Sequence, residues 1–370
     1  MILAAGRNDL RFDKALTLLD RGTLEQAWSA AALLAAKGEE VVLHAAAGGA
    51  RPDSVFDVAS LTKPLAAALF LALVQEGKLP ADGLLREAVP LRFGDPAGEG
   101  IRFSHLLSHT AGLAAWRPFF DDLYAEEMLE NRKLAGTAEG HDRIVRAALD
   151  FPLEAPPGAR TLYSDLGFIV LGRAIELAAF GPLDRLLRSH VTGPLGMADT
   201  GYLPLSSLPG DSAWRIVPTG WSDARDLEKV GLVDDENAAA MGGIAGHAGV
   251  FSTASDLFLF AREILRAGKG EGRLFHRGAA RAMSERVPEP PGCPRTLGWD
   301  TPTPPSQAGS RFSPRTIGHL GYTGCSLWID LEREVTVVLL TNRVVYGADN
   351  RLIRNYRPGI HDAVLEGILS

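Results

Sequence analysis

Segments that favour β-structure lie toward both ends of this chain, and a long stretch with helical periodicity separates them. Residues 40–49 have the pattern of a strand that ends in a glycine turn, and residues 326–331 and 335–342 are two β-rich runs with the pattern of a hairpin. Between residues 79 and 218, helical segments alternate with Pro and Gly. The sequence therefore predicts a mixed α/β (α+β) fold whose sheet is assembled from both ends of the chain.

This pattern predicts two domains with a functional site between them. Residues 1–80 and 250–370 are expected to form the α/β sheet domain, an antiparallel sheet flanked by N- and C-terminal helices. Residues 81–249 are expected to form a mainly helical inserted domain. Helices are predicted over residues 12–37 (one or two helices), 103–109, 142–149, 165–179, 183–191, 256–265 and 360–369.

Composition excludes several classes of function. The chain has 370 residues, is 46% hydrophobic and 22% charged, and carries a net charge of −7 without a basic run. These values are typical of a globular protein and argue against binding to nucleic acid or to an anionic membrane surface. Its two cysteines, Cys293 and Cys325, form no C-x-x-C motif, so we expect no structural zinc site; reduced thiols and a disulfide both stay open.

The N-terminal residues lack the cationic start and the long apolar core of a secretory signal. The longest apolar run, residues 64–74, is too short to cross a bilayer. We therefore expect a cytoplasmic protein without a membrane span, although a removed leader would reverse that expectation. A monomer is favoured, and small molecules rather than macromolecules are the expected partners.

Ser60 and Lys63 stand three residues apart at the start of an apolar segment that should form a buried helix. Residues at this spacing share a helix face, so the amine of Lys63 can reach the hydroxyl of Ser60. A serine becomes a nucleophile when a base takes its proton, and apolar burial can keep a lysine neutral enough to do so. Such a pair is weak on its own, since an exposed lysine near a capping serine has the same spacing.

Two further segments suit acyl transfer. Tyr163 lies in a loop that leads into a helix, where it could relay a proton to a leaving group if nearby positive charge lowers its pKa. Residues 317–324 hold His319, Gly321 and Tyr322 at the start of the first C-terminal β-run, where an edge strand could offer a backbone N–H to an oxyanion. Taken singly, the Tyr163 segment is better explained as a helix N-terminus with a packed tyrosine, and residues 317–324 are equally compatible with a glycine turn before a hairpin.

Together, the three segments resemble the serine β-lactamase and penicillin-binding-protein superfamily, in particular its class C-like branch of D-alanyl-D-alanine carboxypeptidases, esterases and β-lactamase-related hydrolases. Tyr163 follows Ser60 by 103 residues, and His319 follows Tyr163 by 156. The resemblance covers nearly the whole chain and rests on the segments Phe56–Pro64, His105–Leu113, Tyr163–Asp165, Gly242–Gly249 and His319–Gly321.

The resemblance implies a serine hydrolase without cofactor or metal that cleaves an ester or amide, such as a β-lactam, a D-Ala peptide or a small ester. It implies that Ser60 attacks the carbonyl, Lys63 accepts its proton and Tyr163 shuttles protons to the leaving group. His319 takes the place of the lysine in the third motif, and the backbone N–H groups of Ser60 and Tyr322 form the oxyanion hole. An acyltransferase or a slowly deacylating penicillin sensor would use the same acyl-Ser60.

Two residues depart from the pattern of the superfamily. Asp165 stands where relatives commonly have Asn, and its charge would favour the ammonium form of Lys63 if the carboxylate points toward it. Leu320 replaces a Thr or Ser, which removes a hydroxyl that can meet a substrate carboxylate. His319 is mostly neutral at pH 7 unless perturbed. We therefore expect better turnover of small uncharged esters than of penicillins.

Other conspicuous residues can be interpreted as structural or as functional. His105 and His109 are four apart but lack a third ligand, so we expect them to be scaffold residues. His247 is a substrate-binding candidate, with Asp165, Leu320, Gly321 and Trp116, although a loop-fixing role is favoured for it. Trp299 is a second possible cleft wall. Cys325 is expected to pack rather than react.

Overall fold

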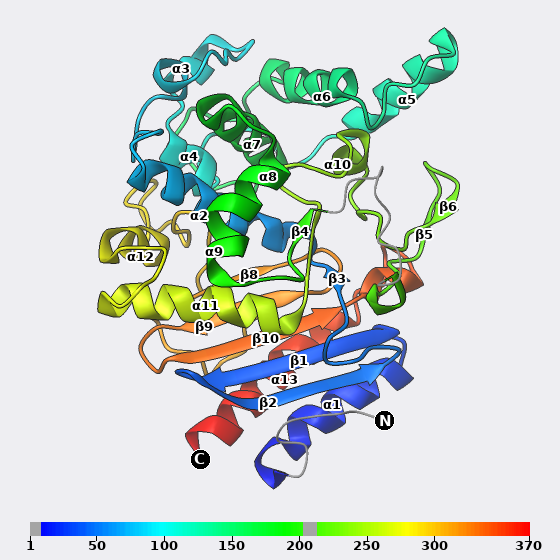
Figure 1. The fold of residues 1–370 in the computed structure, drawn as a ribbon, viewed down its shortest axis with the longest axis vertical. Helices are drawn as coiled ribbons and strands as arrows, with labels where there is room; N and C mark the ends of the chain where they lie inside the picture. Colours follow the sequence, from blue (N-terminus) through cyan, green and yellow to red (C-terminus); the bar gives the residue numbers. More distant parts are fainter. Residues whose placement is uncertain (1–8, 203–212) are drawn as a thin grey trace.

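The computed structural model describes residues 9–202 and 213–370. Its centre is a five-stranded antiparallel sheet in the order β2-β1-β10-β9-β8 (Figure 1). The strands come from the two ends of the chain, as expected: β1 (Ala30–Lys37), β2 (Glu40–Gly48), β8 (Thr316–Leu320), β9 (Ser326–Asp330) and β10 (Val335–Thr341). The fold class predicted from the sequence is confirmed.

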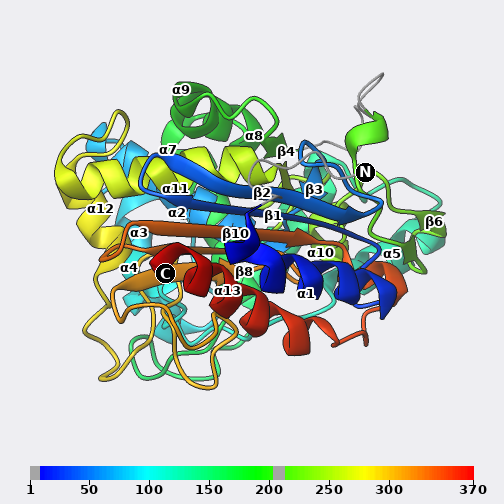
Figure 2. The same ribbon diagram turned by 90° about the horizontal axis from the view of Figure 1, so that it is seen from below.

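Both faces of this sheet are covered by helices. On one face lie α1 (Asp13–Leu24) and α13 (Ile353–Leu369), which contact each other; α11 (Ala254–Lys269) packs on β1 and β10 from the other face (Figure 2). Side chains of β1 therefore alternate between two cores, with Leu33 facing α1 and α13 and Leu34 facing the opposite core.

The prediction of helix throughout residues 12–37 is wrong for its second half. Helix α1 ends at Leu24, and the Ala- and Leu-rich residues that follow form β1. A strand buried on both faces has a continuous apolar sequence without alternation, and Ala and Leu are good helix formers, so local pattern favoured the wrong element. Pairing with β10 over seven residues, from Ala31 to Lys37, decides the outcome.

The middle of the chain is mainly helical and lies beyond the sheet, at the top of Figure 1. Its helices are α3 (Leu85–Ala88), α4 (Phe103–Leu107), α5 (Phe119–Glu130), α6 (Ala138–Asp150), α7 (Asp165–Ala179), α8 (Leu183–Leu187), α9 (Gly193–Leu195) and α10 (Glu236–Ala240). Between this region and the sheet runs α2 (Thr62–Gln75), whose residues from Thr62 to Leu73 are all buried. The predicted domain boundaries stay a prediction.

Several smaller elements complete the fold. Strands β3 (Phe56–Asp57), β7 (Val250–Ser252) and β4 (Gly201–Tyr202) form a second sheet, β5 (Trp221–Ser222) pairs with β6 (Leu227–Glu228), and α12 (Arg277–Ser284) packs on α11. The last helix begins seven residues earlier than predicted, at Ile353, and contains Pro358. Cys293 and Cys325 are both buried free thiols.

Within the described ranges, no single helix is long and apolar enough to cross a membrane. The segments Asp165–Ala179 and Leu183–Leu195 reach that length and composition only as a pair, and they are bent by 77° relative to each other.

Candidate active site

Ser60 lies in a tight turn between β3 and α2. The turn is a single 3₁₀ turn, Ala59–Leu61, and the side chain of Asp57 accepts a hydrogen bond of 2.8 Å from the backbone N–H of Ala59. Ala59 has φ +48°, a left-handed conformation that is uncommon for a residue with a Cβ and is often found at functional sites. The sequence thus places Ser60 at the end of a constrained turn, directly before a buried helix.

Lys63 is fully buried one turn later, and its amine reaches Ser60 as the spacing predicts. The Nζ atom lies 2.9 Å from Ser60 Oγ, 2.6 Å from Asp165 Oδ1 and 3.1 Å from the carbonyl oxygen of His247. The contacts with Ser60 Oγ and the His247 carbonyl are hydrogen bonds that Lys63 donates, and the contact with Asp165 is an ion pair. The site is therefore arranged around a charged Lys63 that donates a hydrogen bond to Ser60.

The expectation that apolar surroundings keep Lys63 neutral is wrong. Burial disfavours the ammonium form, but the Asp165 carboxylate and Tyr163 outweigh that effect, so the pKa of Lys63 lies above its usual value. Asp165 points at Lys63 rather than away, which is the condition under which its charge opposes the role of Lys63 as a base. The structure therefore favours the ammonium form of Lys63 at rest.

Tyr163 lies just before α7, beside the charged lysine. The Lys63 Nζ lies 4.9 Å from the centroid of the tyrosine ring, which packs on His109 with 4.5 Å between ring centroids. Burial raises the pKa of Tyr163, and the positive charge of Lys63 only partly opposes it. The expected lowering of its pKa is therefore not found, and Tyr163 is a phenol at rest, able to give a proton rather than take one.

His319 is placed at the site by β8, the edge strand of the sheet, which contacts the Ser60 turn. Its Nδ1 lies 2.8 Å from the carbonyl of Leu320, and a carbonyl only accepts, so Nδ1 carries the proton. Burial and the positive charges of Lys63 and Arg295 lower the pKa of His319 well below its usual value. His319 is thus a neutral imidazole, and its buried Nε2 has no hydrogen-bond partner among the described residues.

The end of β8 approaches the Ser60 turn closely because residue 321 is glycine. A Cβ at Gly321 would lie 2.5 Å from the carbonyl oxygen of Val58. Thr323 Oγ1 donates to the carbonyl of Asp57 at 2.9 Å, and Arg343 Nε holds the carbonyl of Tyr322 at 2.7 Å. Within the described part of the chain, the backbone N–H of Tyr322 donates no hydrogen bond. It is therefore available to a substrate oxygen.

His247 contributes its backbone to the site and its ring to the loop. Its carbonyl accepts from Lys63, whereas its buried Nε2 lies 2.9 Å from Asp235 Oδ1. Asp235 also caps α10 by accepting from the backbone N–H of Ala238 at 2.7 Å. These contacts fit the favoured loop-fixing role, and substrate binding by His247 stays a prediction.

The remaining candidates are divided between surface and core. Trp116 is 43% exposed, and its ring centroid lies 6.4 Å from that of Phe120. Leu320 is partly buried. Contact of either residue with substrate stays a prediction. Trp299 is 1% exposed and stacks on Phe260, so it is a core residue rather than a cleft wall.

The scaffold residues make the structural contacts expected of them. His105 Nδ1 accepts from the backbone N–H of Arg102, and His109 Nδ1 accepts from that of Ser164 at 3.0 Å. Cys325 is buried in the core, and its burial raises the pKa of the thiol to about 11. A thiol with this pKa is a poor nucleophile at neutral pH, in agreement with a packing role.

Sequence reasoning missed one residue of the site, Arg295. Its Cζ lies 5.6 Å from the centroid of the Tyr163 ring, and its charge contributes to the low pKa of both His109 and His319. Arg295 belongs to the Pro-rich stretch of residues 287–305, whose composition predicts a surface loop, and it is part of no recognisable motif.

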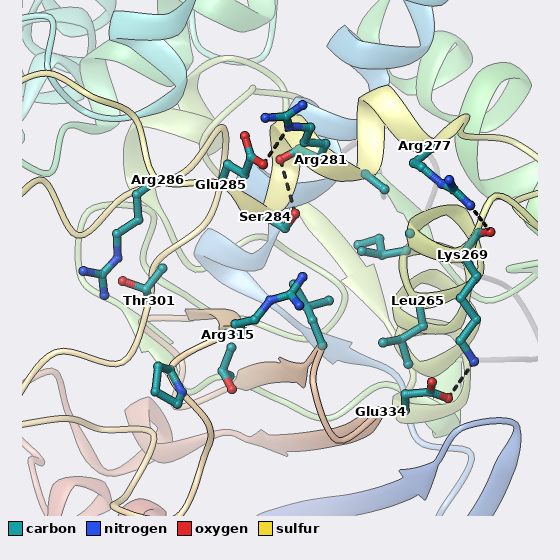
Figure 3. A pocket seen from close by; sticks show the side chains of 16 residues that line it. Leu265, Lys269, Arg277, Arg281, Ser284, Glu285, Arg286, Thr301, Arg315 and Glu334 are labelled. Atoms are coloured by element: carbon teal, nitrogen blue, oxygen red, sulfur yellow. Dashed lines mark hydrogen bonds and ion pairs between the residues drawn. The ribbon is translucent and has the colours of Figure 1, made fainter.

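A cavity of about 800 Å³ lies elsewhere, among α11, α12 and the residues that lead into β8 (Figure 3). None of Ser60, Lys63, Tyr163 and His319 lines it. Two of its cations are paired within the cavity wall, Lys269 with Glu334 at 2.7 Å and Arg281 with Glu285 at 2.6 Å. The three sequence motifs are therefore not located at this cavity.

Comparison with known proteins agrees with this geometry. The family model described as Beta-lactamase matches residues 16–357. A relative from Escherichia coli (strain K12), named as a D-alanyl-D-alanine carboxypeptidase, is 30% identical over 323 residues, which cover 80% of this chain and 70% of the relative. A relative of the same name from Salmonella typhi has the same identity and coverage.

Solved structures show the same fold. EstCE1, described as a hydrolase with promiscuous acyltransferase activity, superposes with a TM-score of 0.71 at 22% identity. The match covers 96% of this chain and 98% of the EstCE1 chain. The octameric penicillin-binding protein homologue from Pyrococcus abyssi superposes with a TM-score of 0.69 at 20% identity. The match covers 90% of this chain and 74% of the homologue. With the family model spanning residues 16–357, this chain belongs to the beta-lactamase family and is a hydrolase of that fold.

Proposed function

We propose that this protein is a serine hydrolase that opens an ester or amide through an acyl-Ser60 intermediate. The observation that carries the proposal is the 2.9 Å contact between Ser60 Oγ and the buried Nζ of Lys63, next to Tyr163. Nucleophile, base and proton donor thus meet at one point, which is the arrangement that covalent catalysis requires.

Acylation starts from the fraction of molecules in which Lys63 has lost a proton. Ser60 Oγ then attacks the substrate carbonyl and passes its proton to the Lys63 amine, while the Tyr163 hydroxyl gives its proton to the leaving group. Lys63 returns a proton to the Tyr163 phenolate, which restores both groups and leaves the acyl-Ser60 ester. Water then takes the place of the leaving group. Tyr163 first passes its proton to the neutral amine of Lys63, and the water gives a proton to the Tyr163 phenolate as it attacks the ester. The Lys63 ammonium protonates Ser60 Oγ as the C–O bond breaks, which releases the acid and restores both groups.

The negative oxygen of the tetrahedral intermediate is assigned to the backbone N–H groups of Ser60 and Tyr322. The free N–H of Tyr322 and the close approach permitted by Gly321 support this assignment. Arg343 holds the carbonyl of Tyr322, in the peptide that follows this N–H. The neutral His319 can accept a hydrogen bond at Nε2 but supplies no charge.

A peptide ending in a D-amino acid is the substrate class that the comparisons favour. The carboxypeptidase names of relatives at 30% identity support it. Transfer of the acyl group to an alcohol or amine instead of water would use the same intermediate. Adding such an acceptor and analysing the products separates hydrolysis from transfer.

A substrate panel tests the proposal. Wild-type protein and Ser60→Ala are assayed on a short-chain p-nitrophenyl ester, a penicillin and a D-Ala-D-Ala peptide, with Ser284→Ala, in the wall of the Figure 3 cavity, as the matched control. Turnover should be lost in Ser60→Ala for every substrate that the wild type cleaves, and retained in Ser284→Ala. Equal turnover by Ser60→Ala and wild type would contradict the proposal.

A further inference from the structure

The cavity in Figure 3 is separate from the serine site and lies between two helices and the sheet. Its wall consists mainly of residues of α11 and α12, residues that lead into β8, and the turn between β9 and β10. The volume of about 800 Å³ is in the range of sites that hold small molecules. Ile264 and Leu265, which are buried, contribute apolar surface to the wall, as does Leu331. The cavity is therefore large enough for a small-molecule ligand.

Positive charge is concentrated in the wall of this cavity. The cationic side chains that line it are Lys269, Arg277, Arg281, Arg286 and Arg315. The carboxylates that line it are those of Glu285 and Glu334. The wall thus has an excess of positive charge, whereas the whole chain carries a net charge of −7. A local positive patch on an acidic protein attracts a small anion, while the charge of the whole molecule disfavours an extended polyanion such as nucleic acid.

Three arginines of the wall keep donors that no acid of the protein uses. Both carboxylates of the wall are already paired, with Lys269 at 2.7 Å and with Arg281 at 2.6 Å. In the part of the chain that the structure describes, Arg277, Arg286 and Arg315 have no ion-pair partner. Arg277 donates only to the carbonyl of Lys269, at 2.6 Å. A planar guanidinium with free donors is suited to bidentate binding of phosphate or carboxylate oxygens.

Backbone hydrogen bonds fix the chain next to two of these arginines. Arg286 follows the end of α12, where the N–H of Glu285 donates to the carbonyl of Arg281 at 2.8 Å. Arg315 directly precedes β8, and its carbonyl accepts from the N–H of Leu331 at 3.1 Å. The two guanidinium groups thus reach the cavity from different elements of the fold (Figure 3). A ligand bound to both would bridge α12 and the sheet.

We propose that this cavity binds a small anion with two or more phosphate or carboxylate groups, held by Arg277, Arg286 and Arg315. Three unpaired cations match a ligand with about three negative charges, such as a diphosphate or a tricarboxylate. The hydroxyl of Ser284 is not among the donors, because it already donates to the carbonyl of Arg281 at 3.2 Å. The site is independent of the acyl-Ser60 chemistry, since no residue of the serine site lines the cavity.

Titration calorimetry at fixed ionic strength tests the proposal, with inorganic pyrophosphate in one arm and citrate in the other. The wild type should bind at least one of the two anions saturably, and the tighter of them identifies the ligand group as phosphate or carboxylate. Arg286→Gln and Arg315→Gln should each raise the Kd about tenfold, as expected for a lost charge-assisted hydrogen bond. The matched control is Arg354→Gln. It removes an exposed arginine of α13, on the opposite face of the sheet, that likewise has no ion-pair partner among the described residues, and it should leave the Kd unchanged.

Glu285→Gln provides a variant of opposite sign. It removes a negative charge from the wall and frees Arg281, so the Kd should fall. No saturable binding of either anion by the wild type would overturn the proposal. So would an unchanged Kd in Arg286→Gln or Arg315→Gln, an equal effect of the control variant, or a Kd in Glu285→Gln that does not fall. The exchanged side chains are all exposed, so the core stays intact. Labelling of Ser60 by a fluorophosphonate in each variant reports separately on the proposed function.

Discussion

At the scale of single residues, the chemistry depends on the pair Lys63 and Asp165. A carboxylate 2.6 Å from Nζ stabilises the ammonium, so the base that attack by Ser60 requires is present in only a small fraction of molecules at neutral pH. The sequence places both residues correctly, but the charge state of Lys63 depends on where the Asp165 side chain points. That orientation is a property of the folded site.

Replacing Asp165 by Asn should shift the pH dependence of catalysis. The proposed mechanism requires neutral Lys63, so kcat/KM should rise as the pH passes upward through the pKa of Lys63. Removing the neighbouring charge lowers that pKa, and we expect the acid limb to move to lower pH by about one unit or more. A full pH–rate profile of the wild type and of Asp165→Asn on one ester measures this shift. The control is Asp20→Asn, which changes an exposed residue of α1. An acid limb that stays in place or moves upward would contradict this account.

Replacing Tyr163 by Phe should discriminate between leaving groups. In the proposed mechanism the phenol gives its proton to the departing atom, and loss of a general acid typically costs about 10² to 10⁴ in rate. A p-nitrophenolate can leave as an anion without a proton, whereas an amine must be protonated before it can leave. We therefore expect a large loss of kcat for an amide or alkyl ester and a smaller loss for a p-nitrophenyl ester. Equal losses for both substrates would remove Tyr163 as the proton donor.

At the scale of elements, the C-terminal hairpin could be predicted and β1 could not. Residues 326–342 combine β-branched residues with a short turn, so local preference and final structure agree. The residues of β1 are mainly Ala and Leu, and their strand is stabilised by partners about 300 positions away in β10. Helix α6 begins earlier than predicted because Thr137 caps it, with its side chain accepting from Gly140 at 3.1 Å.

The turn between β3 and α2 should make stability depend on pH through Asp57. Burial, with the negative charge of Asp234, raises the pKa of Asp57 to about 7, whereas an unfolded Asp has a pKa of about 4. The folded state therefore binds a proton that the unfolded state releases, and the stabilising contribution of protonated Asp57 is lost as the pH rises from 4 to 7.

Asp57→Asn removes this titration and keeps one side-chain acceptor for the backbone. Denaturant unfolding of both proteins at pH 5 and pH 8 measures the effect. On going to pH 8, the free energy of unfolding of the wild type should fall relative to that of the variant by a few kcal/mol, of the order of 1.4 for each unit of pKa shift. A difference between the two proteins that is the same at both pH values would show that Asp57 does not titrate in this range.

At the scale of the whole molecule, the sequence predicts the site as three segments brought together between a sheet and a helical region. Their order and spacing make Ser60, Lys63, Tyr163 and His319 the candidate site residues before any coordinates are known. Arg295 could not be found in this way, because it reaches Tyr163 through backbone bridges to Asp300 and Gly318 rather than through a motif. One residue beside Tyr163 is therefore placed there by the tertiary fold alone.

Reaction with a fluorophosphonate, followed by intact-mass spectrometry and peptide mapping, tests the central claim most directly. The account predicts one adduct, located on Ser60, that forms faster as the pH rises because neutral Lys63 becomes more abundant. It also predicts no adduct on Ser60→Ala. A wild-type protein that stays unlabelled, or that carries the adduct on another residue, would contradict the account.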